Sequence, residues 1–166
     1  MAKKLVILGA GESGVGTALL AKQKGYEVFV SDGSTIKANF QKELEDNGIA
    51  FESGKHSVDQ ILNADEVMKS PGIPEKNEMV KAIRAKGIPV ISEIEFGYRY
   101  KGFSKIAAIT GSNGKSTATS LLYHICQLVN DDVAMVGNIG FSFARQIAVA
   151  PKSLYIIEVS SFQLDD

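Results

Sequence analysis

Two glycine-rich turns constrain the fold of this chain more than any other feature of its sequence. The first is Gly9-Ala10-Gly11-Glu12-Ser13-Gly14, and the second is Thr110-Gly111-Ser112-Asn113-Gly114-Lys115-Ser116-Thr117. Each turn follows a short apolar run and opens a helical pattern. A strand, a glycine turn and a helix in succession are typical of α/β proteins that bind phosphate groups at the start of the helix.

Strand-like and helix-like segments alternate along the whole chain, which predicts an α/β fold with mostly parallel sheets. Strands are expected at 5–8, 27–31, 49–51, 66–69, 88–91, 105–110, 132–136 and 153–159. Helices are expected from the first glycine turn to a stop at Gly25, and at 37–47, 57–63, 75–86, 93–100, 116–129 and 141–149. We predict a Rossmann-like parallel-sheet domain at 1–98 and, at 99–166, the incomplete start of a second α/β domain.

Composition excludes several classes of protein. The 18 basic and 19 acidic residues give a net charge of −1, which argues against a nucleic-acid binder that relies on bulk charge. The single cysteine, Cys126, excludes an internal disulfide, and together with His56 and His124 it lacks the ligand spacing of a zinc site. No apolar run approaches the ~20 residues of a membrane span, so we expect a cytoplasmic protein without membrane insertion.

The first turn has the G-x-G-x-x-G spacing in its required context. Gly9 would make the tight turn, Gly11 would let a diphosphate approach the backbone, and Gly14 would allow close packing of helix on strand. Asp32, at the end of the next strand, could accept the hydroxyls of a ribose. NAD, FAD and a UDP-sugar all carry a diphosphate, so the motif leaves the ligand open, and a turn that serves packing alone is the alternative.

The second turn is a shorter variant of the G-x-x-x-x-G-K-[ST] phosphate loop, because Ile109 stands five residues before Gly114. Its backbone amides would surround phosphate oxygens. Lys115 would contact the β- and γ-phosphates and Ser116 would reach Mg²⁺. The alternative is a simple helix cap with a solvated lysine, but a triphosphate site is the favoured interpretation.

Three further segments follow predicted strands. Glu158 lies near the carboxyl end of the last strand, where a carboxylate beside a phosphate loop suits Mg²⁺, although an acid that points to solvent is equally compatible. The segments 137–140 and 70–74 are turns, and Pro71-Gly72 suits type II geometry.

The remaining chemically reactive side chains are assigned to packing. We expect the two histidines at the surface or in helix packing, Cys126 in an inert core, and the pair Phe141 and Phe143 in helix packing.

The complete set of motifs, in this order along the chain, resembles the Mur ligases. The resemblance rests on 9–14, 70–73, 110–117, Gly137-Asn138-Ile139-Gly140 and Glu158-Val159-Ser160-Ser161-Phe162-Gln163-Leu164. The last string is most similar to the D-glutamate-adding branch of the family. One departure concerns Gly33-Ser34, where members of the family carry a hydroxyl residue followed by arginine.

The resemblance implies roles for individual residues. The UDP part of the substrate would bind Gly11, Ser13, Gly14, Asp32, Ser70, Pro71, Gly72, Asn138, Ser160 and Gln163. ATP would bind Gly111, Ser112, Asn113, Gly114, Lys115, Ser116 and Thr117. Ser116 and Glu158 would hold Mg²⁺, and the catalytic residues would be Lys115, Glu158 and Asn138.

The implied activity is ATP-dependent addition of D-glutamate to UDP-N-acetylmuramoyl-L-alanine, through an acyl phosphate, in peptidoglycan synthesis. The chain ends at Asp166, before the rest of the ATPase domain and the domain that receives the amino acid, so we expect it to be inactive alone. An NAD-binding redox or sensor protein and a non-catalytic nucleotide-binding module are the alternatives. The first would leave the second glycine turn without a role.

Overall fold

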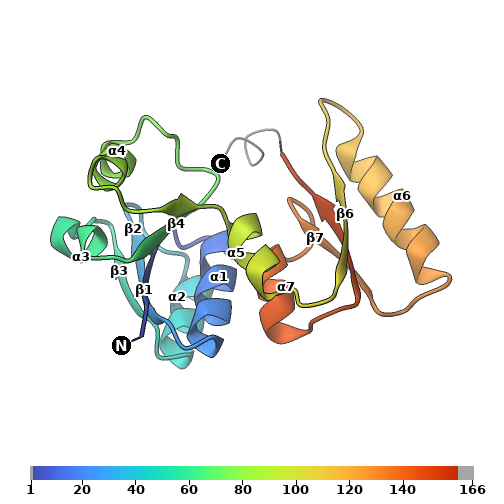
Figure 1. Ribbon diagram of the computed structural model, residues 1–166, viewed down its shortest axis with the longest axis horizontal. Helices are drawn as coiled ribbons and strands as arrows, with labels where there is room; N and C mark the ends of the chain where they lie inside the picture. The colour runs from blue at the N-terminus through green and yellow to red at the C-terminus, as the bar shows by residue number, and fades with distance from the viewer. Residues whose placement is uncertain (1, 161–166) are drawn as a thin grey trace.

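Five parallel strands form the first sheet of the protein, in the order β3-β2-β1-β4-β5. The structure, a computed structural model, describes residues 2–160 (Figure 1). The strands are β1 (Lys4–Leu8), β2 (Glu27–Asp32), β3 (Ala50–Ser53), β4 (Glu66–Lys69) and β5 (Val90–Ile91). Because β1 lies between β2 and β4, the strand order reverses beside it, and open α/β sheets bind ligands at the carboxyl end of such a point.

A second parallel sheet has the order β6-β8-β7. Its strands are β6 (Lys105–Ile109), β7 (Val133–Gly137) and β8 (Leu154–Glu158). The change from one sheet to the other falls between β5 and β6. The predicted α/β class with parallel sheets is therefore confirmed, whereas the division into domains at 98 and 99 stays a prediction.

Seven helices connect the strands within residues 2–160. They are α1 (Glu12–Gln23), α2 (Ala38–Asp46), α3 (Val58–Leu62), α4 (Glu78–Ala85), α5 (Glu93–Tyr100), α6 (Lys115–Gln127) and α7 (Phe143–Val149). The start expected at residue 141 is wrong, because Ser142 caps α7 by accepting the N–H of Arg145. Phe143 is buried, as expected, but Phe141 precedes the helix and is 53% exposed.

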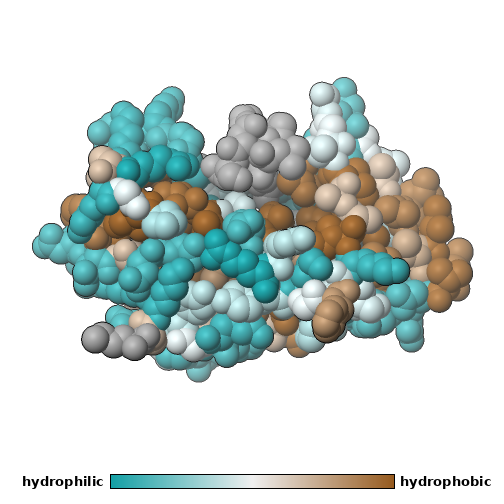
Figure 2. All heavy atoms as spheres, viewed as in Figure 1, coloured by the Kyte–Doolittle hydropathy of each residue, from teal (hydrophilic) through white to brown (hydrophobic). Residues whose placement is uncertain are grey.

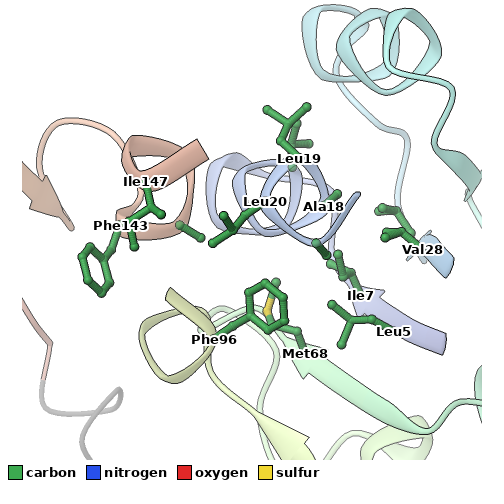
Figure 3. Packing of buried hydrophobic residues seen from close by; sticks show 14 of the residues in the cluster. Leu5, Ile7, Ala18, Leu19, Leu20, Val28, Met68, Phe96, Phe143 and Ile147 are labelled. Carbon is green, nitrogen blue, oxygen red and sulfur yellow. The ribbon is translucent and has the colours of Figure 1, made fainter. Parts of the chain in front are cut away.

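One hydrophobic core connects the two sheets through α1 and α7. Leu20 of α1 lies beside Phe143 and Ile147 of α7, and Phe96 of α5 lies nearby (Figure 3). The helices approach closely because Gly16 has no side chain. A Cβ at that position would stand 2.2 Å from the hydroxyl oxygen of Ser142. The packing of α7 on α1 therefore places the second sheet against the first unit.

Charged side chains strengthen this contact. The Arg145 side chain is almost fully buried, and its Nε donates to Glu12 on α1 at 2.7 Å. Its Nη2 donates to Glu43 on α2 at 3.0 Å. Burial opposes the charge of Arg145, but the two carboxylates outweigh this effect and raise the pKa of its guanidinium. Arg145 thus joins α7 to two helices of the first unit.

The outer face of α6 and the two residues that follow the helix expose a group of large apolar side chains. The exposed fractions are 60% for Leu121, 52% for Ile125, 85% for Leu128 and 87% for Val129. Brown atoms gather on this side of the molecule, at the right of Figure 2. Cys126 lies on the same helix and is only half-buried, so its expected place in the core is wrong. No helix within residues 2–160 has the length and apolar character needed to cross a membrane.

Candidate functional site

A cleft of 510 Å³ opens at the carboxyl ends of β1, β2 and β4. A second cavity of 340 Å³ adjoins it and shares Gly11, Glu12, Asp32 and Ser34. The cleft is lined by Gly9, Gly11, Glu12, Ser13, Asp32, Gly33, Ser34, His56, Ser70, Pro71, Gly72, Ile73 and Asn77. The segments that follow β1, β2, β3 and β4 thus meet around one space, where the strand order predicts a ligand.

Of the ten residues predicted to bind UDP, six line this cleft. They are Gly11, Ser13, Asp32, Ser70, Pro71 and Gly72. Gly14 packs against the carbonyl group of Gly9 in the turn. Asn138 and Ser160 follow strands β7 and β8 of the second sheet. Gln163 lies outside the described residues.

The three glycines of the first turn have distinct environments. Gly9 has a φ of +92°, which favours glycine, and a Cβ there would stand 2.7 Å from the Ser70 hydroxyl. At Gly14 a Cβ would stand 1.9 Å from the carbonyl oxygen of Gly9. At Gly11 a Cβ would meet nothing within 4 Å. Gly9 and Gly14 are therefore required for packing, while Gly11 leaves the backbone open to the cleft.

Asp32 holds the two turns that flank it. One carboxylate oxygen accepts the N–H of Ala10 at 2.7 Å, and the other accepts the N–H and hydroxyl of Ser34 at 2.8 and 2.7 Å. Burial alone would raise the pKa of Asp32, but these hydrogen bonds outweigh it and lower the pKa. A carboxylate accepts about four hydrogen bonds, so Asp32 keeps little capacity for a ligand.

The turn after β4 forms another wall of the cleft. The N–H of Ile73 donates to the carbonyl of Ser70 at 3.0 Å and closes the turn. Gly72 is not among the glycines with positive φ, so the expected type II geometry is wrong. Lys69 is nearly buried, and its ammonium group contacts the Ile73 carbonyl and the carboxylate of Glu75. Sequence reasoning missed this lysine because it lies within a strand.

His56 also lines the cleft, where its side chain is half-buried at the surface of the protein. Its Nδ1 lies 2.7 Å from the Ser31 hydroxyl, and that hydroxyl donates to Glu52 at 2.7 Å. Glu52 also accepts the N–H and the hydroxyl of Ser57. Only the parallel register of β2 and β3, which places Ser31 beside Glu52, brings these groups together.

The second glycine turn leads into α6 through a glycine whose backbone has the left-handed conformation. Gly114 is the N-cap and has a φ of +75°, and Gly111 has a φ of +146°. Lys115 folds over the turn, and its ammonium group donates to the Gly111 carbonyl at 2.7 Å. Ser116 and Thr117 are exposed in the first turn of the helix. The turn therefore presents a cation, two hydroxyls and a helix N-terminus on one surface.

Glu158 lies beside this turn because of the strand register. At the carboxyl end of the sheet Glu158 pairs with Ile109 on one side and Gly137 on the other. Glu158 is 4% exposed. Among residues 2–160 its Oε2 atom is buried and has no hydrogen-bond partner. The alternative of an acid that points to solvent is thus excluded.

The 137–140 turn packs tightly against the same strand end. A Cβ at Gly137 would stand 2.3 Å from the Glu158 carbonyl oxygen, which accepts the N–H of Asn138 at 3.1 Å. The Asn138 side chain is exposed. The second glycine turn, Glu158 and Asn138 are therefore neighbours at one edge of the second sheet.

Fold and site together define an α/β protein with two phosphate-type glycine turns, each at the carboxyl edge of a parallel sheet. Residues 3–92 match the family described as the Mur ligase MurD-like, N-terminal domain. The chain belongs to this family.

Curated relatives extend the likeness over the whole chain. The UDP-N-acetylmuramoylalanine–D-glutamate ligase of Cytophaga hutchinsonii is 57% identical over 100% of this chain. The enzyme of the same name from Bacteroides fragilis is 53% identical over 99% of the chain. The chain spans 37% of the length of each of these proteins.

Solved structures agree in fold. A UDP-N-acetylmuramate:L-alanyl-gamma-D-glutamyl-meso-diaminopimelate ligase from Neisseria meningitides matches with a TM-score of 0.64 at 22% identity, over 98% of this chain and 55% of that chain. A UDP-N-acetylmuramate-alanine ligase from Thermotoga maritima matches with a TM-score of 0.58 at 17% identity, over 96% of this chain and 37% of that one.

Proposed function

We propose that this chain supplies the UDP-substrate site and the phosphate loop of an ATP-dependent ligase. That ligase joins D-glutamate to UDP-N-acetylmuramoyl-L-alanine in the cytoplasm, during peptidoglycan synthesis. Residues 1–98 are the UDP-binding domain, and 99–166 are the start of the ATP-binding domain. The names of the curated relatives support this reaction.

The observation that carries the proposal is the cleft at the first glycine turn. Its open face at Gly11 and the start of α1 suit a diphosphate. Ser13 and Ser70 add hydroxyl donors beside the same space. The adjoining cavity of 340 Å³, lined in part by Phe40, offers an apolar wall for a nucleobase.

The second turn fits a nucleoside triphosphate with Mg²⁺. The buried Oε2 of Glu158, which has no hydrogen-bond partner in the part of the chain that the structure describes, is an oxygen that a cation would satisfy. Ser116 offers a hydroxyl. Within residues 2–160 no group of three or more His, Cys, Asp and Glu residues is arranged to hold a metal ion. Mg²⁺ commonly completes such a site with phosphate oxygens and water, and it neutralises charge on the transferring phosphoryl group.

The reaction needs no nucleophilic side chain. The alanyl carboxylate of the substrate attacks the γ-phosphorus of ATP, ADP leaves, and an acyl phosphate forms. The amine of D-glutamate then attacks the acyl carbon, phosphate leaves, and the amine loses a proton. Lys115 stabilises the negative charge on the phosphoryl oxygens, and Asn138 orients the substrate or nucleotide beside it.

Calorimetric titration tests the first site. We expect the 166-residue chain to bind UDP-N-acetylmuramoyl-L-alanine saturably and NADH not at all, because the cleft is assigned to a UDP diphosphate. Gly11→Val, which fills the open face of the turn, should remove the binding. Binding of NADH alone would instead support a redox or sensor protein.

The second site is tested with Lys115→Ala. Loss of the ammonium group beside the phosphates should lower the affinity for Mg²⁺–ATP by at least about tenfold, because a charge-assisted hydrogen bond contributes about 1.5–3 kcal/mol. Lys105→Ala is the matched control, since Lys105 lies at the opposite end of β6. Equal affinity of both variants for ATP would contradict the assignment.

A further inference from the structure

His56 is the one imidazole in the cleft, and the proposed function leaves it without a role. It is half-buried, on the loop between β3 and α3. Its ring fills the space beside Gly33, where a Cβ would stand only 2.9 Å from Nε2. The absence of a side chain at Gly33 therefore lets the Nε2 atom reach the wall of the cleft.

The hydrogen bonds behind the ring determine which nitrogen carries the proton. Burial opposes the charge of Glu52, but hydrogen bonds from Ser57 and Ser31 outweigh it and lower the pKa, so Glu52 is an ionised, acceptor-only group at neutral pH. The single proton of the Ser31 hydroxyl is therefore donated to Glu52. The Ser31 oxygen is left to accept, and Nδ1 of His56, 2.7 Å away, is the donor.

A neutral imidazole has one donor and one acceptor nitrogen. With the proton on Nδ1, the Nε2 atom is an acceptor, and within residues 2–160 no hydrogen bond to it is formed. The carboxylate of Asp32, the other acceptor on this wall, already accepts three hydrogen bonds. A donor group of a bound nucleoside would therefore find its partner in His56.

We propose that His56 is a ligand-binding residue of the cleft whose Nε2 accepts a hydrogen bond from an O–H or N–H group of the bound uridine nucleotide. This inference rests on the proposed function, because it requires the nucleotide to occupy this cleft. The candidate donors are the two ribose hydroxyls and the imide N–H of the base. Phosphate oxygens are acceptors and do not suit a neutral Nε2.

Two substitutions separate ligand binding from a structural role. In His56→Asn the side-chain amide can replace Nδ1 as the donor to Ser31, but nothing occupies the place of Nε2. In His56→Gln the longer amide can present its oxygen near the place of Nε2. We expect His56→Asn to lower the affinity for UDP by about fivefold to tenfold, and His56→Gln to recover part of this loss. His124→Gln, on α6 and away from the cleft, should bind UDP like the parent chain.

The ligand series identifies the donor. UDP, 2′-deoxy-UDP, 3′-deoxy-UDP and N3-methyl-UDP are titrated into the parent chain and into His56→Asn. The analogue that lacks the donor should bind the parent chain more weakly than UDP but bind His56→Asn as well as UDP does. A nitrogen NMR spectrum should show a protonated Nδ1 in the free chain and a shift of the Nε2 signal when UDP binds.

Several results would overturn the inference. They are unchanged UDP affinity in a folded His56→Asn, a loss in His56→Gln as large as in His56→Asn, and equal effects of every analogue on both proteins. In each of these cases UDP still binds the parent chain, so the proposed function stands. Failure of the folded parent chain to bind UDP would overturn the proposed function and this inference together.

Discussion

Replacing Gly14 by alanine should destabilise the protein by about 3 kcal/mol or more. The added Cβ would stand 1.9 Å from the carbonyl oxygen of Gly9 and 3.0 Å from its carbonyl carbon. Both are backbone atoms of the tight turn, and Gly14 is itself buried in α1, so neither side can move without separating the helix from β1. Urea unfolding monitored by circular dichroism measures the loss.

Gly11→Ala is the matched control for this substitution. Gly11 has a φ of −84°, which any residue adopts, and a Cβ there meets nothing within 4 Å. We expect its stability to remain within about 0.5 kcal/mol of the parent chain. Equal destabilisation by the two substitutions would show that Gly14 does not serve close packing of the helix on the strand.

Replacing Glu93 by glutamine should stabilise the protein at neutral and higher pH. Glu93 begins α5, is 2% exposed, and accepts the N–H of Ala144 at the start of α7. Burial raises its pKa to about 7 from the ordinary value of 4.5, and the charge of Glu12 adds to this, while hydrogen bonds from the N–H groups of Ala144 and Phe143 oppose it. Glutamine keeps an acceptor oxygen and removes the buried charge.

The pH dependence follows from the direction of this shift. Below pH 4.5 the carboxyl group is protonated in the folded and the unfolded chain, so it costs nothing. Between pH 4.5 and 7 the folded state binds more protons than the unfolded state, so stability falls as the pH rises. Above pH 7 the full penalty remains, on the order of 3 kcal/mol.

Urea unfolding at pH 5 and pH 8 measures this penalty. The advantage of Glu93→Gln over the parent chain should be small at pH 5 and should grow to a few kcal/mol at pH 8. Glu95→Gln on the same helix is the control, because Glu95 is half exposed and pairs with Arg99. An advantage that is the same at both pH values would contradict the raised pKa.

The sequence alone determined the elements that depend on local spacing. The two glycine turns predicted strand, turn and helix at the observed places, because close helix–strand packing at Gly14 and the left-handed N-cap at Gly114 both require glycine. The alternation of strands and helices predicted parallel sheets, because a helix between two strands returns the chain so that both strands can run in the same direction. These features need only neighbours along the chain.

Only the tertiary structure decided how distant residues meet. The pairing of β2 with β3 aligns Ser31 with Glu52 and brings His56 into the cleft. The place of Glu158 in the central strand of the second sheet buries its carboxylate. Neither fact is visible in a periodic pattern, because strand register and burial depend on contacts between segments that are far apart in the sequence. The sequence thus predicted where phosphates would be bound, and the packing of strands decided which side chains surround them.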